Sequence, residues 1–181
     1  MILSNMWMKL WNIFLTHNRP WTLWELVVFG SLLAMVSGVI WRMKKQGKIS
    51  RSQALAGTLL ALFLVLVFAS TVFTRMPARR SYELMPLWSW QRVLTHGDTA
   101  ILQENLLNIL LFVPIGILLF FVSQKLNLRH ACLIGFSISF LIEVCQLVLC
   151  RGLFEWDDMV HNTLGCGAGF WAMRWWHRLR H

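Results

Sequence analysis

Apolar residues are gathered in long, nearly uninterrupted stretches, which is the pattern of helices that cross a membrane. Five stretches approach the roughly 20 apolar residues that a bilayer core requires, and they cover residues 23–41, 54–73, 102–122, 131–149 and 160–176. The stretch 54–73 carries no charge, whereas the third and fourth stretches contain acidic and amide side chains and the last contains His161, Asn162 and Arg174. The pattern predicts an all-α fold: a polytopic transmembrane helical bundle of about five spans.

Residues 1–19 follow a different pattern. Apolar side chains recur there at helical spacing with polar residues between them, at Leu3, Met6, Trp7, Leu10, Ile13 and Phe14. This spacing predicts an amphipathic helix that lies in the membrane interface and ends before Pro20. No small-residue cleavage site follows it, so we do not expect a cleaved signal peptide. Residues 20–181 contain no repeat or linker and are expected to form a single transmembrane domain.

Composition supports the membrane class. The 181 residues are 57% hydrophobic and only 14% charged, whereas a soluble domain carries about 25% charged residues. A chain of this size has too little interior to bury so much apolar surface, and intrinsic disorder requires the opposite composition. The net charge of +9 could indicate nucleic acid, but the basic residues divide between two membrane faces, so we expect no nucleic-acid partner.

The positions of Lys and Arg predict the orientation. Of the 17 basic residues, ten fall on the face that holds the 42–51 connection and the C-terminal tail, and seven fall on the other face. We therefore predict a multi-pass protein of the cell membrane with its C-terminus in the cytoplasm. The N-terminus and the 74–101 connection are expected outside, and the lipid bilayer is the first partner.

Polar residues inside the last three spans gather at one membrane face. Because the spans alternate in direction, the start of the third, the end of the fourth and the start of the fifth meet there. A charged residue at the centre of a span raises the free energy of membrane insertion by about 2.5–3.5 kcal/mol, so the presence of these residues indicates a structural or functional role. The candidates are Asn108, Glu143, Gln146, Arg151, Asp158 and Asn162. They predict a polar pocket that opens to the outside.

Each candidate also has a plainer interpretation. Glu143 could be a binding or catalytic carboxylate, or a buried group that locks helices together. Arg151 could hold a lipid phosphate or a carboxylate, or contact interfacial headgroups. Asp158 and His161 stand three residues apart, but the set is too generic for a ligand shell. We expect no metal and no cofactor.

Small residues predict how the helices pack. Gly165 and Gly169 form a small-xxx-small pair that indicates close packing of the fifth span on another helix, or a homo-oligomer seam. Pro114 and Gly116 are expected to kink the third span. The four cysteines form no Cys-x-x-Cys pair and are typical apolar fillers. No nucleophile or phosphate-loop motif occurs, which disfavours an enzyme.

Three segments together resemble the VanZ-like family of membrane proteins. They are ENLLNILLFVPIG (104–116), SFLIEVCQ (139–146) and RGLFEWDDMVHNTLG (151–165). The resemblance implies a bacterial cell-envelope protein whose family namesake is linked to low-level teicoplanin resistance. The pocket would then bind the glycopeptide or limit its access to lipid-linked wall precursor. The alternatives are an intramembrane enzyme acting on a lipid or precursor headgroup, and a structural subunit of a membrane complex.

Overall fold

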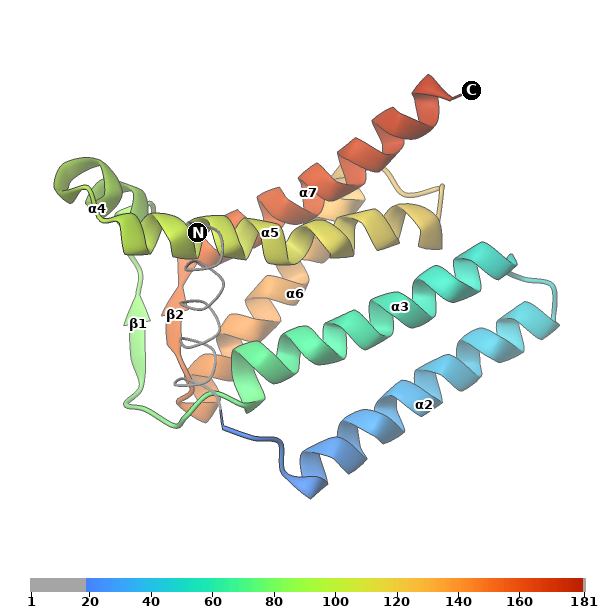
Figure 1. The fold of residues 1–181 in the computed structure, drawn as a ribbon, viewed down its shortest axis with the longest axis horizontal. Coiled ribbons are helices and arrows are strands. Elements are labelled where there is room, and N and C mark those ends of the chain that lie inside the picture. The colour runs from blue at the N-terminus through green and yellow to red at the C-terminus, as the bar shows by residue number, and fades with distance from the viewer. Residues whose placement is uncertain (1–18, 181) are drawn as a thin grey trace, which may run out of the picture.

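The computed structural model describes residues 19–180, so the amphipathic helix predicted for residues 1–19 falls outside them except for its last residue. Five long helices account for most of the chain: α2 (Leu23–Lys45), α3 (Arg51–Phe68), α5 (Thr99–Val122), α6 (Leu128–Leu149) and α7 (Trp156–Leu179). A π-helical turn, η1 (Ala69–Phe73), extends α3. As Figure 1 shows, α2 and α3 form one hairpin beside the group of α5, α6 and α7.

The all-α helical bundle predicted from the sequence is confirmed. Four of the described helices are long and apolar enough to cross a membrane: α2, α3 together with η1, α5 and α6. The fifth predicted span does form a helix, α7, but this helix is not among the four. Acidic residues at its start, glycines in its middle and basic residues at its end make it the most polar of the long helices.

Side-chain caps explain where the helices begin. Thr22 and Ser50 each start a capping box, at α2 and α3 respectively. The side-chain oxygen of the cap residue accepts from the backbone N–H three residues on, and the side chain of that later residue accepts from the backbone N–H of the cap. Asp98 accepts from two amides at the start of α5, and Asn127 caps α6. These caps satisfy N–H groups that have no partner within their helix.

Glycines bring the backbones of α5 and α7 into contact. A Cβ added to Gly165 would lie 2.0 Å from the carbonyl oxygen of Ile109, and one added to Gly169 would lie 2.2 Å from that of Val113. Gly116 faces the α7 backbone in the same way, at 1.9 Å. The small-xxx-small pair thus packs against a helix of its own chain.

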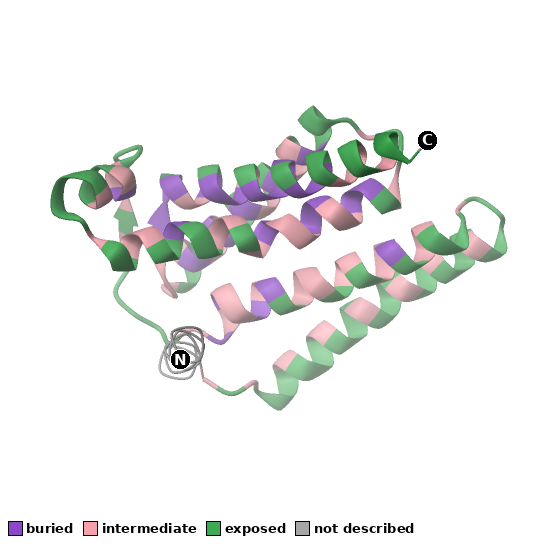
Figure 2. Cartoon of the chain, turned by 45° about the horizontal axis from the view of Figure 1, so that its top comes forward, coloured by how far each residue is buried: buried purple, intermediate pink, exposed green. Residues whose placement is uncertain are grey.

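The first hairpin is packed on one side only. Helix α2 has no buried residue, and its apolar side chains Leu23 and Trp24 are 75% and 78% exposed. Figure 2 shows this helix almost entirely exposed, in contrast to the buried faces of the α5, α6 and α7 group. Apolar side chains exposed in this number are expected where the solvent is lipid.

Two connections form structure that the hydrophobic pattern does not predict. The connection before α5 holds a strand, β1 (Ser81–Glu83), and a short helix, α4 (Trp88–His96); the connection before α7 holds a strand, β2 (Leu153–Glu155). The strands pair in parallel, with Glu83 opposite Glu155. This pair brings the two connections together beside the ends of α6 and α7 (Figure 1).

Candidate functional site

Glu143 is the most deeply buried of the predicted site residues. It lies on α6, which ends at Leu149, nearly two turns before the end of the helix, and it is 1% exposed. Its Oε2 atom accepts a hydrogen bond of 2.9 Å from the backbone N–H of Glu155. The end of β2 therefore covers this carboxyl group.

Asp158 joins the same group of side chains from α7. Its Oδ1 accepts a hydrogen bond of 2.7 Å from Nδ2 of Asn108, which lies on α5. Asp158 also interacts electrostatically with Glu143. Three helices thus contribute to one cluster of side chains, as the alternation of the spans predicts. We use the name polar pocket for this cluster, which consists of Asn108, Glu143, Gln146, Asp158 and Asn162 with Arg75.

Arg75 supplies the positive charge of the polar pocket, and sequence reasoning missed it. It follows η1 and acts electrostatically on both Glu143 and Asp158. Its guanidinium also lies beside Gln146: a Cβ added to Gly152 would be 3.1 Å from Arg75 Nη1 and 3.1 Å from Gln146 Oε1. The available signal was its position directly after the uncharged second span, on the membrane face where the sequence predicts the polar pocket.

Two of the three amides of the polar pocket, Gln146 and Asn162, each retain an unused acceptor. Asn162 donates to Ser139 Oγ at 2.8 Å, and Gln146 donates to the carbonyl of Thr71 at 2.9 Å. Both side chains are buried, and their oxygens have no hydrogen-bond partner among the described residues. Since buried acceptors are normally satisfied, these oxygens mark places where a bound molecule or a water would donate.

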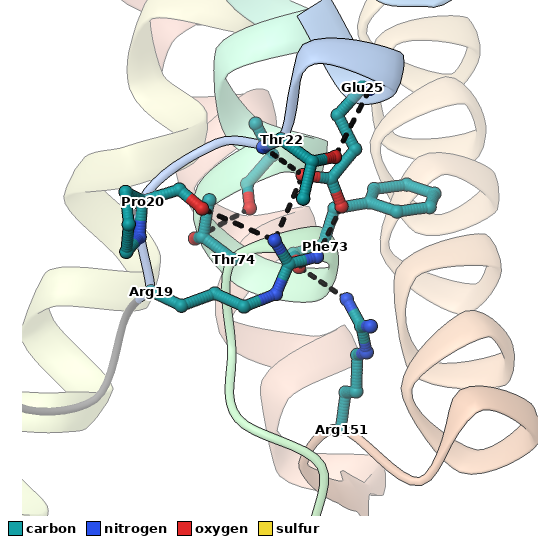
Figure 3. A network of polar contacts seen from close by, with 8 residues as sticks. Arg19, Pro20, Thr22, Glu25, Phe73, Thr74 and Arg151 are labelled. Carbon is teal, nitrogen blue, oxygen red and sulfur yellow. Dashed lines mark hydrogen bonds and ion pairs between the residues drawn. The ribbon is translucent and has the colours of Figure 1, made fainter.

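Arg151 points elsewhere. Its Nη1 donates to the carbonyl of Phe73 at the end of η1, and Arg19 donates to the same carbonyl at 3.0 Å. Arg19 also pairs with both carboxylate oxygens of Glu25. Figure 3 shows the two arginines approaching Phe73 from different elements. The sequence predicts that Arg151 lies with the other five residues. In the structure its guanidinium lies at a neighbouring site, because the hydrogen bond to the Phe73 carbonyl holds it at the end of η1.

Glu155 is a second residue that the sequence analysis did not select for the site. It is only 8% exposed at the end of β2. Burial, and then the neighbouring charges of Asp158, Glu104 and Asp157, raise the pKa of Glu155 from 4.5 to about 8. Acidic groups therefore outnumber the one arginine of the polar pocket in this part of the molecule.

Asp157 has a structural role beside the pocket. Its carboxylate accepts from the backbone N–H of Leu87 at 2.5 Å and from the N–H and hydroxyl of Ser89 at 3.0 and 2.5 Å. It thereby holds the start of α4, where Leu87 has a left-handed backbone with φ of 62°. A fourth hydrogen bond, from Trp90 Nε1 to His161 Nε2 at 2.8 Å, also holds α4 against α7.

The arrangement of potential metal ligands does not indicate a metal centre. Within residues 19–180, no group of three or more His, Cys, Asp and Glu side chains is arranged to hold an ion. The arrangement instead offers hydrogen-bond acceptors and one guanidinium, which suits an organic group with hydroxyl, amide, ammonium or carboxylate functions.

The fold defines a membrane protein built as an α-helical bundle with a buried, carboxyl-rich site. The VanZ/LLP1 family model matches residues 55–177, which include most of α3, all of α5 and α6, most of α7 and every residue of the polar pocket. The chain belongs to this family. Comparison with curated proteins and with solved structures gives no match.

Proposed function

We propose that the polar pocket binds a polar group of the bacterial cell envelope and thereby gives low-level resistance to teicoplanin. The group is carried by the glycopeptide itself or by the lipid-linked wall precursor to which the drug must gain access. The observation that supports this proposal is the cluster of the buried Glu143 with the partly buried Asp158 and Arg75, which lies among helices of a membrane protein. Ionisable side chains in such a place are functional candidates because burying them is costly.

The chemistry of the pocket fits a ligand rich in donors. Carboxylates bind hydroxyl, amide and ammonium groups, and the acceptors of Gln146 and Asn162 add two more positions of the same kind. The guanidinium of Arg75 can pair with a carboxylate or phosphate of the ligand. Glycopeptides and lipid-linked wall precursors both combine such donors with an anionic group.

The test compares teicoplanin and vancomycin susceptibility of strains that express wild type, Glu143→Gln or Asp158→Asn at equal membrane abundance. Both changes keep the side-chain size and remove the charge. Glu83→Gln is the matched control, since Glu83 lies on β1 and bonds the nearby Met85 amide. We expect protection in wild type and control and its loss in both pocket variants. Full protection by the pocket variants would refute the proposal.

We also propose that the polar pocket faces the outside, with the C-terminus in the cytoplasm. The excess of basic residues in the 42–51 connection supports this orientation. Labelling of intact cells with a membrane-impermeant thiol reagent tests it, using Leu94→Cys in α4 and Lys48→Cys in the connection between α2 and α3. Leu94 is 82% exposed. Labelling at Leu94→Cys alone is expected, and labelling at Lys48→Cys alone would mean the inverse orientation.

A second candidate function is an intramembrane enzyme that modifies a lipid or precursor headgroup. The raised pKa of Glu155, about 8, is the observation in its favour, because a general acid or base works best with a pKa near the operating pH. Lipid and wall-precursor profiles of deletion and overexpression strains test this candidate. Unchanged profiles in both strains would refute catalysis and leave the binding proposal in place.

A further inference from the structure

An apolar groove runs beside α3 and is distinct from the polar pocket. It lies between α3 and α5, has a volume of about 260 Å³, and has an apolar lining of Trp21, Phe63, Leu66, Val67 and Leu111. Leu66 is 50% exposed, whereas Val67 is 2% exposed. The groove therefore has a packed floor and an open side, and the open side belongs to the surface that α3 presents to lipid.

The dimensions of the groove match a hydrocarbon chain. At roughly 1.5 Å per residue, the distance along the helix from Phe63 to Thr74 is about 16 Å, and one leaflet of a bilayer core is about 15 Å thick. The volume is below the roughly 300–1,000 Å³ of pockets for drug-sized ligands. A single acyl chain fits such a space better than a compact polar molecule does.

One end of the groove is polar. Ser70 and Thr74 line it there, and the carbonyl of Thr74 accepts from the backbone N–H of Arg19 at 2.7 Å. The adjoining carbonyl of Phe73 accepts from the side chains of Arg19 and Arg151 (Figure 3). The groove therefore ends beside two guanidinium groups at the end of the second span, the depth at which lipid headgroups begin.

The charges at this end are unequal. Glu25 neutralises Arg19 through both of its oxygens, and it also bonds the Thr22 amide. Arg151 has no carboxylate partner within residues 19–180, and its Nη2 and Nε make no hydrogen bond there. A half-buried guanidinium with two unused donors is suited to an anionic oxygen group such as phosphate.

We propose that this groove is a binding site for an anionic glycerophospholipid of the bilayer. One acyl chain lies between α3 and α5, and the phosphate is held by Arg151. This site does not depend on what the polar pocket binds, because the two share no lining residue. It gives Arg151 a ligand of its own, separate from that of Glu143 and Asp158.

The test uses full-length protein stripped of lipid in detergent, to which phosphatidylglycerol or phosphatidylcholine is added, with retained lipid counted by native mass spectrometry. Arg151→Gln removes the charge, and Arg79→Gln, at an exposed arginine outside the groove, is its control. Leu66→Trp fills the groove. Leu59→Trp is the matched control, since Leu59 lies on the same helix with a similar exposure of 44%.

Wild type is expected to retain phosphatidylglycerol in preference to phosphatidylcholine. Arg151→Gln should weaken phosphatidylglycerol retention by roughly fivefold, the effect of about one basic residue at an anionic membrane surface, and should leave phosphatidylcholine unchanged. Leu66→Trp should weaken both lipids, and the two controls should weaken neither.

Three results would overturn the proposal. Equal retention of the two lipids by wild type would overturn it, and this test needs no variant, so it remains valid even if Arg151→Gln fails to fold. Unchanged retention in Leu66→Trp would mean that the chain does not lie in the groove. A change of oligomeric state in Leu66→Trp with unchanged lipid retention would mean that the groove receives a second protein helix instead.

Discussion

The contact between α5 and α7 makes a strong prediction about Gly165→Ala. The added Cβ would lie 2.0 Å from the carbonyl oxygen of Ile109 and 2.9 Å from its carbonyl carbon, where ordinary contacts are 3.4–4 Å. The obstructing atoms are backbone, so no side-chain rotation relieves the overlap and the two helices must separate. Gly165 is also buried, so the separation opens the centre of the bundle.

The magnitude follows from two opposing effects. Overpacking costs about 1–3 kcal/mol, and backbone contact places this site at the upper end, while replacing glycine by alanine in a helix returns about 1 kcal/mol. We expect a net loss of about 2 kcal/mol, or a Tm lower by roughly 4–8 °C for a chain of this length. The control is Gly30→Ala in α2, where an added Cβ meets nothing within 4 Å, and which should match or exceed wild-type stability.

The effect is measured by thermal unfolding in detergent, with the labelling of Cys166 by a thiol-reactive dye as the readout. Cys166 is 0% exposed and is the next residue in the chain, so its labelling reports the opening of this helix pair. Gly165→Ala should label at a lower temperature than wild type and Gly30→Ala. If Gly165→Ala and Gly30→Ala gave the same transition, the close approach of the two backbones would be wrong.

Three further predictions concern the connections around the polar pocket. Asp157→Ala removes the acceptor for the Leu87 and Ser89 amides and should cost about 1–2 kcal/mol, typical of a lost helix cap, with faster hydrogen exchange confined to α4. Glu155 ionises near 4.5 when unfolded but near 8 when folded, so the folded state holds the extra proton and stability falls as pH rises between these values. The Tm advantage of Glu155→Gln over wild type should therefore grow from pH 5 to pH 8, and a constant difference would contradict it. Arg75→Gln removes the pocket's cation and should lower Tm more at pH 8 than at pH 5, whereas Arg79→Gln, at an exposed arginine, should not.

Much of the fold could be predicted because its causes are local. A span of apolar residues predicts a membrane helix without reference to the rest of the chain, and the alternation of spans places Asn108, Glu143 and Asp158 on one face. Their meeting in the structure follows from that alternation. The small-xxx-small spacing of Gly165 and Gly169 likewise indicates a close approach, although only the structure shows that the partner is α5.

The connections could not be predicted because their structure depends on distant residues. Strands of three residues have no readable period, and β1 and β2 exist only because they pair with each other across the fold. Arg75 and Glu155 lie at the edges of these connections, so their place beside Glu143 depends on the same pairing. The direction of Arg151 depends on the Phe73 carbonyl, 78 residues earlier in the chain.

The end of the second span has a consequence for biosynthesis. The carbonyls of Thr71 and Phe73 receive side-chain donors from Gln146 and Arg151, which follow 75 and 78 residues later. A nascent chain must therefore insert two further spans before these donors reach η1. Until then the Thr71 carbonyl lacks its Gln146 donor and the Phe73 carbonyl has only the donor from Arg19, so a product truncated after α5 would leave the end of the second span less completely hydrogen-bonded.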